Sequence, residues 1–183
     1  RHLRRLPRFE EKIVQRILAR HRDEGLDYVE YRTMSSHAAS DDPEGFVNFH
    51  RLNADTMQAY SGNGFTARYI VSLPRWEPLE GYALIQRLLD KSPELTSTIV
   101  GLDFCFFEEG YPPSSLQAFF ERLQRDNEAR PERALEVTYH VGEVYFDKSL
   151  ESAVRWCHQA AQLGTRRLGH ATALGLDPAV AVE

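Results

Sequence analysis

Leu135-Glu-Val-Thr-Tyr-His140-Val-Gly-Glu143 and, about one helix length further on, Arg166-Arg-Leu-Gly-His170 are the stretches that decide the fold. In each, a short run that we interpret as a strand ends on a histidine. The carboxyl ends of neighbouring parallel strands lie on the same side of a barrel or an open α/β sheet. We therefore expect the polar residues that end these two strands to meet at one mouth.

Three earlier segments also read as strands, over residues 27–34, 67–73 and 96–104. The five strands start near residues 27, 66, 97, 135 and 166, so that 31 to 39 residues separate one start from the next. Segments with apolar residues at helical spacing lie between them. Intervals of this length are typical of βαβ units rather than hairpins. The predicted fold class is α/β, with parallel strands alternating with helices in about five βα units.

Five βα units are compatible with an open doubly wound sheet or with part of a (β/α)₈ barrel. A complete barrel takes about 250 residues, and this chain has 183. We interpret residues 1–183 as a single domain. Residues 35–64 begin with a polar, turn-rich stretch and are longer than the usual βα connection, so we interpret them as an insertion or a long connection.

The composition is that of an ordinary globular domain, with 42% hydrophobic and 27% charged residues. The net charge of -5 gives no strong signal for nucleic-acid binding and favours a small neutral or anionic substrate. Cys105 and Cys157 are the only cysteines, so no disulfide framework is indicated and a cytoplasmic location is the expectation. No apolar run approaches the ~20 residues of a membrane span.

The chemistry of the mouth starts from His140 and Glu143, which place a metal ligand or base beside a carboxylate. His170 ends the next strand, where it can polarise an attacking water. Gly101 interrupts an apolar strand, which indicates either close approach of a ligand or tight packing. The alternative for both histidines is a structural role at a strand end, with a solvated glutamate in the loop beyond.

These motifs resemble the adenosine deaminase-like proteins, which are metal-dependent amidohydrolases. The resemblance covers about residues 9 to 178, and its specific part is His140-Val-Gly-Glu143 with Gly169-His170. Residues 28–32, 67–72 and 100–103 occur in the order and spacing of successive strands of that family. The implied fold is a partial (β/α)₈ TIM-type barrel.

The resemblance also implies a role for each site residue. His140 is similar to a zinc ligand of the family, and Glu143 to the group that protonates the purine ring nitrogen. His170 is similar to the residue that orients the hydroxide on the zinc, and Gly101 to the backbone contact with the purine. The implied cofactor is Zn²⁺. The implied reaction is hydrolytic loss of ammonia from C6 of an adenine ring, as in the conversion of adenosine to inosine.

The sequence departs from the family at two places. The family has a His-x-His pair on its first strand and an Asp-Asp pair on its last, and neither falls where expected here. Asp41-Asp42-Pro43 reads as a loop. His140 alone cannot hold a catalytic zinc, which takes three or more protein ligands. We therefore expect the sequence to span strand units two to six of a longer protein and to be inactive alone.

The leading functional hypothesis is a zinc-dependent deaminase of an adenine-containing nucleoside or nucleotide. Some larger proteins of this family act on nucleotides in bacterial antiviral defence, so the resemblance extends to ATP-to-ITP conversion. A homo-oligomer or a larger assembly is compatible with it. The alternatives are a non-catalytic deaminase-like module that binds purines or acts as a scaffold after losing the metal, and a metal-dependent barrel that hydrolyses another amide or amine.

Overall fold

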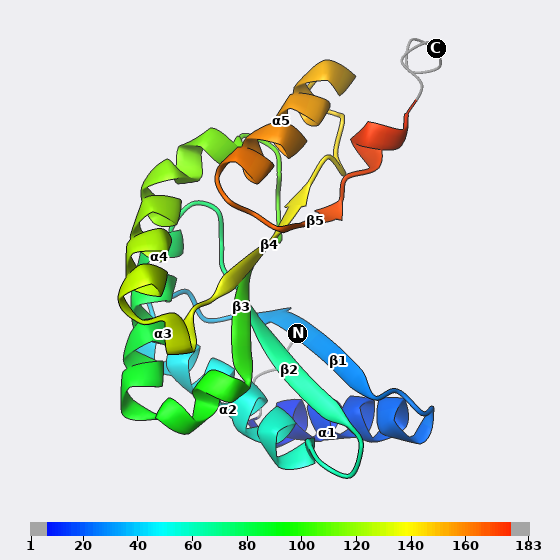
Figure 1. The fold of residues 1–183 in the computed structure, drawn as a ribbon, viewed down its shortest axis with the longest axis vertical. Coiled ribbons are helices and arrows are strands. Elements are labelled where there is room, and N and C mark those ends of the chain that lie inside the picture. The colour runs from blue at the N-terminus through cyan, green and yellow to red at the C-terminus, as the bar shows by residue number, and fades with distance from the viewer. Residues whose placement is uncertain (1–6, 177–183) are drawn as a thin grey trace. The chain divides into compact units, whose positions relative to one another are not determined.

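The computed structural model describes residues 7–176, in which five strands alternate with helices (Figure 1). The α/β fold class predicted from the sequence is confirmed. The helices and strands, in chain order, are α1 (Pro7–Asp23), β1 (Tyr28–Met34), α2 (Pro43–Tyr60), β2 (Thr66–Ser72), α3 (Pro78–Lys91), β3 (Ile99–Phe104), α4 (Gln117–Ala129), β4 (Glu136–Val141), α5 (Leu150–Gln162) and β5 (Arg167–His170).

The five strands are parallel and form one sheet in the order β1-β2-β3-β4-β5. A helix lies in each connection because parallel neighbours need a crossover of a dozen or more residues. Strand order that follows chain order without reversal is that of a (β/α) barrel, whereas a doubly wound sheet reverses its order at a switch point. The strand order is therefore that of a (β/α) barrel and not of a doubly wound sheet. In the register of β4 with β5, His140 lies opposite Gly169 and Val141 opposite His170.

The chain divides into two compact units, and the first comprises residues up to 71 together with 79–100. The buried face of α2 carries Phe46, Ala54 and Met57. Asp42 caps this helix by accepting a hydrogen bond of 2.8 Å from the backbone N–H of Gly45. Of the loop predicted at Asp41-Asp42-Pro43, the two aspartates lie before the helix and Pro43 is the first residue of α2. Residues 35–64 comprise a polar connection, all of α2 and the turn before β2.

The second unit comprises residues 72–78 and the chain from 101 onwards. Its core is an aromatic cluster in which the rings of Phe104, Phe119, Phe120 and Tyr139 contact one another. These rings come from β3, β4 and α4, so the cluster holds the ends of the two strands against the helix. The buried residues of α5 are Ala153, Cys157 and Ala160.

One local prediction is wrong. β3 begins at Ile99 rather than Thr96, because Pro93 starts a short 3₁₀ helix that takes in residues up to Ser97. A second 3₁₀ turn, Pro113–Leu116, precedes α4, and no side chain caps that helix. Over residues 7–176, no helix is both long enough and apolar enough to cross a bilayer.

Candidate functional site

The carboxyl ends of β2, β3 and β4 place three polar side chains in a row. Asp103 is fully buried, and its Oδ1 lies 2.7 Å from Nδ1 of His140. Its other oxygen, Oδ2, accepts a hydrogen bond of 3.0 Å from the hydroxyl of Ser72. Because a carboxylate only accepts, the His140 proton lies on Nδ1 and the lone pair on Nε2. A histidine held in this way by a carboxylate is the usual form of a metal-ligating histidine.

Gly169 lies against the ring of His140. A Cβ atom added at Gly169 would lie 3.0 Å from Cδ2 and 3.1 Å from Nε2 of that ring. Glycine here lets β5 approach the imidazole so closely that a side chain would push it aside. The Gly-His pair at the end of β5 therefore contributes to the position of His140 as well as carrying His170.

Arg75 ties the ends of β3 and β4 together. It is buried, and its Nη2 donates hydrogen bonds to the carbonyl oxygens of Phe104 at 3.0 Å and His140 at 2.5 Å. The guanidinium carbon lies 4.9 Å from the centroid of the Tyr139 ring. Burial raises the pKa of Tyr139 to about 12, and the Arg75 cation opposes part of that rise. Both strand ends are thus fixed by one cation.

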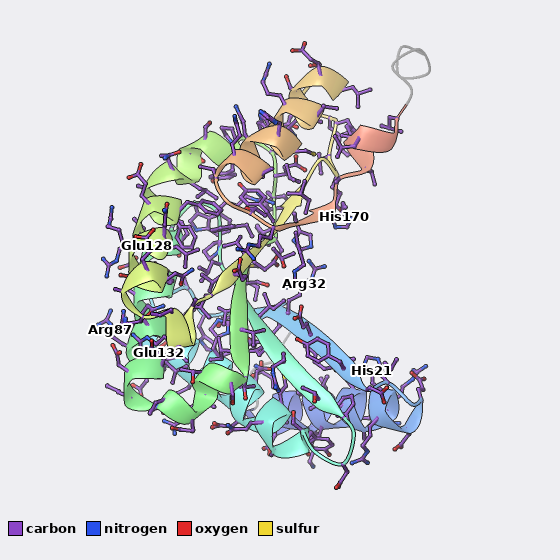
Figure 2. The ribbon with its side chains drawn as sticks, in the orientation of Figure 1. His21, Arg32, Arg87, Glu128, Glu132 and His170 are labelled. Carbon is purple, nitrogen blue, oxygen red and sulfur yellow. The ribbon has the colours of Figure 1, made fainter. Side chains whose placement is uncertain are left out.

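His140, Glu143 and His170 are brought together, as predicted. Nε2 of His170 lies 3.3 Å from Oε2 of Glu143, and the centroids of the His140 and His170 rings are 5.1 Å apart. His170 stands at the end of β5 (Figure 2). The side chains of Glu143 and His170 are both partly exposed, whereas His140 is buried. An imidazole–carboxylate pair that is open to solvent therefore lies beside a buried, oriented imidazole.

The backbone that presents His170 is strained. His170 has a φ of 63° and Ala171 a φ of 49°, both in the left-handed region that non-glycine residues seldom occupy. The amide of Ala171 donates to the carbonyl oxygens of Val141 at 3.0 Å and Gly169 at 2.9 Å, which holds this conformation. Each such residue costs on the order of 1 kcal/mol or more, and strain of this kind clusters at functional sites.

Gly101 is not brought to this cluster. It is buried within β3, opposite Glu136 of β4, and His140 comes four residues later on that strand. At ~3.3 Å per residue, Gly101 and His140 are roughly 13 Å apart along the sheet. The register therefore places Gly101 within β3, level with the start of β4 rather than with His140.

Asp103, Ser72 and Arg75 are the contributors that sequence reasoning missed. Each acts on a residue 29 to 65 positions away in the chain. Asp103 is the one with a signal, because a carboxylate at the end of an apolar strand needs a buried partner. Ser72 ends β2 and Arg75 lies three residues beyond it, and neither carries a comparable signal in the sequence.

The residues described include one candidate metal ligand at this mouth, His140. Within the range 7–176, no group of three or more His, Cys, Asp or Glu side chains could hold a metal ion. Nε2 of His140 has the orientation of a ligand, but zinc sites take at least three protein ligands. The side chains present fit part of a metal site and do not complete one.

Comparison with known proteins finds a sequence relative that matches part of the chain. The chain is 36% identical over 72 residues to adenosine deaminase 1 of Streptomyces coelicolor, which covers 39% of this chain and 15% of that protein. No family model matches the chain. The resemblance predicted from the motifs is confirmed by this match together with the solved structures that follow.

Three solved structures share the fold. An amidohydrolase from Burkholderia ambifaria with bound Zn matches with a TM-score of 0.69 at 16% identity, over 95% of this chain and 44% of that one. Adenine deaminase from Arthrobacter aurescens matches with a TM-score of 0.64 at 21% identity, over 95% of this chain and 48% of that one. Arabidopsis ADAL, solved with GMP, matches with a TM-score of 0.59 at 18% identity, over 91% of this chain and 46% of that one. The chain has the fold of part of these barrels and spans less than half the length of each.

Proposed function

We propose that this chain, which resembles the adenosine deaminase-like amidohydrolases in motifs and fold, is the central part of a metal-dependent hydrolytic deaminase. The substrate is an adenine-containing nucleoside or nucleotide. Water adds to C6, the C6–N bond breaks, and the amino group leaves as ammonia with one further proton, which comes from the water and is relayed by the enzyme. The observation that carries the proposal is the convergence of His140, Glu143 and His170 at the ends of two neighbouring strands.

Zinc is the metal proposed. Its chemistry is to generate a nucleophile from water near neutral pH. In this chain, Nε2 of His140 would be one ligand, because Asp103 and Gly169 orient the ring around it. The other ligands would come from parts of the protein outside residues 7–176. For that reason we expect the 183-residue chain alone to be inactive.

Proton transfer is the part of the reaction that this chain would perform. Glu143 would deliver a proton to the purine ring nitrogen, and His170 would orient the attacking water and take up a proton from it. Their contact of 3.3 Å lets the two side chains exchange a proton. Partial exposure of both keeps them accessible to a substrate that enters from solvent.

The test is made on the full-length protein that contains this sequence. Zinc content is measured per chain, and ammonia release is followed with adenosine, AMP and ATP as substrates. We expect about one zinc per chain and ammonia release from at least one of the three. A protein without stoichiometric metal that releases no ammonia from any of them contradicts the proposal. Ammonia release from ATP in this assay also tests the ATP-to-ITP reaction of antiviral defence.

The second candidate is a module that binds purines without turnover. The GMP bound to Arabidopsis ADAL favours it, because that barrel holds a purine nucleotide of a kind other than an adenine substrate. Titration of the full-length protein with GMP and AMP separates the two functions: tight binding with no ammonia release supports the module. Cytoplasmic location and assembly into a homo-oligomer or larger complex stay predictions from the sequence.

A further inference from the structure

The loop that carries Glu143 folds around a buried carboxylate. Glu108 lies in the connection after β3, and its side chain is almost fully enclosed. One oxygen accepts the backbone N–H of Gly142 at 3.0 Å, and the other accepts those of Glu143 at 3.1 Å and Val144 at 3.3 Å. Three successive amides that converge on one anion form a nest, a backbone arrangement that binds anions.

Gly142 is fixed on its other side as well. Its carbonyl oxygen accepts hydrogen bonds from Thr172 Oγ1 at 2.7 Å, from the Tyr145 hydroxyl at 2.9 Å and from the Ala173 amide at 3.0 Å. Thr172 lies two residues beyond His170. The Glu108 carboxylate therefore anchors the loop of Glu143 on one side, and the segment of His170 anchors it on the other.

Lys148 balances the charge of Glu108. Its Nζ lies 4.0 Å from Oε1 of Glu108, donates to the carbonyl oxygen of Val144 at 3.1 Å, and lies 4.4 Å from the ring centroid of Trp156. Nζ also contacts the Asp147 carboxylate. A buried carboxylate without such partners would be costly. This anchor is consequently a charged, hydrogen-bonded unit that an apolar residue could not replace.

We propose that Glu108 is a positioning residue for Glu143, a role that rests on the function proposed above. Glu108 touches the backbone of Glu143 and leaves its side chain for the reaction, so it sets where that carboxylate lies relative to His170. Glutamine at position 108 has nearly the same shape but presents an NH₂ group to one set of amides. At least one N–H of the nest would then face a donor, and the loop would move.

The kinetic test uses Glu108→Gln in the full-length protein, with Glu109→Gln as the matched control because Glu109 is the adjacent, exposed carboxylate. We expect Glu108→Gln to lower kcat by about 10- to 100-fold, the loss typical of charge-assisted hydrogen bonds, with KM within about twofold. Glu109→Gln keeps the parent values. A Glu108→Gln protein with unchanged kcat overturns the role.

A double-mutant cycle separates positioning from general damage to the fold. If Glu108 acts through Glu143, then Glu108→Gln costs nothing further in a protein that already carries Glu143→Gln, because residues that act as a unit are not additive. Losses that multiply in the double variant contradict the proposal, since they show that Glu108 acts on the reaction independently of Glu143.

Hydrogen exchange gives a readout that needs no activity. In the parent protein the amides of Gly142, Glu143 and Val144 are protected by Glu108, and we expect about tenfold or faster exchange of these amides in Glu108→Gln. Amides of α5 serve as the internal control. Unchanged exchange rates of these three amides in Glu108→Gln would contradict the anchoring role. If the parent protein releases no ammonia, the proposed function fails, while this experiment still decides whether Glu108 holds the loop.

Discussion

Oδ1 of Asp103 lies 2.7 Å from Nδ1 of His140, so a fully buried carboxylate at the end of β3 orients the imidazole at the end of β4. Ser72 holds the second oxygen of that carboxylate. The three side chains come from three successive strands. Their arrangement directs the lone pair of Nε2 away from Asp103, where it can bind a metal.

Asp103→Asn should weaken zinc binding by the full-length protein about 10- to 100-fold, because asparagine is a poorer acceptor for the His140 N–H and lowers the basicity of the ring. Competition with a chelator measures the affinity. Asp55→Asn is the control: it removes a carboxylate of an exposed ion pair and should leave the zinc affinity unchanged. Equal affinities of the parent and the Asp103→Asn protein would show that this carboxylate does not prepare His140 for a metal.

Gly142→Ala should destabilise the protein by more than about 1 kcal/mol. The φ of 69° disfavours alanine, and the added Cβ would lie 2.7 Å from Sγ of Cys157. Gly175→Ala is the control, because a Cβ there meets no atom within 4 Å. Urea unfolding measures both. A Gly142→Ala protein as stable as the Gly175→Ala protein would be at odds with the close packing of this loop on α5.

Arg75→Lys should lower the free energy of unfolding by about 1–3 kcal/mol, because lysine cannot reproduce the placement of Nη2 between the carbonyl oxygens of Phe104 and His140. Arg87→Lys is the matched control, since Arg87 is exposed (Figure 2) and donates to the carbonyl of Ala83 in its own helix. Thermal unfolding compares the two variants. Equal shifts would mean that Arg75 does not tie the strands.

His50 should make the protein less stable in acid. Burial lowers its pKa from 6.5 to about 3 in the folded state, where Nδ1 lies 2.6 Å from the Tyr69 hydroxyl. Between these values the unfolded chain binds a proton that the folded chain does not. The stability of the fold with a neutral His50 is therefore fully present above pH 6.5 and is lost as the pH falls towards 3. The free energy of unfolding should be about 2 kcal/mol lower at pH 5 than above pH 6.5.

Urea unfolding at pH 7.5 and pH 5 checks this loss. His50→Gln, which keeps an acceptor for the Tyr69 hydroxyl, should reduce the difference in unfolding free energy between the two pH values. His158→Gln, at an exposed position, should keep it. An unaltered difference in His50→Gln would exclude His50 as its source.

Much of the fold could be predicted because strand and helix periodicity is local. β4 and β5 were placed to within one residue of their bounds, and the intervals between strands indicated the crossovers. Strand spacing left open the choice between barrel and open sheet, because that choice depends on which strands pair, whereas the resemblance to the deaminase-like proteins predicted the partial barrel. β3 was started too early because Thr96-Ser-Thr98 has strand propensity, while Pro93 directs it into a 3₁₀ helix.

The candidate site could be predicted where the site residue ends its own strand, as His140 and His170 do. The residues that support it were missed because their partners lie far along the chain: Glu108 bonds the loop 34 to 36 positions later, and Arg75 bonds a carbonyl 65 positions later. Resemblance predicts a substrate contact at Gly101, whereas the structure places it within β3, two residues before Asp103 and away from His140.

The central claim is that Glu143 carries a proton in a metal-dependent deamination. The most direct measurement is kcat for ammonia release by the full-length Glu143→Gln protein against the parent, with zinc content measured on both. We predict a loss of about 10²-fold or more in kcat at unchanged zinc content, because glutamine keeps the shape and cannot transfer the proton. Full activity in Glu143→Gln would contradict the account.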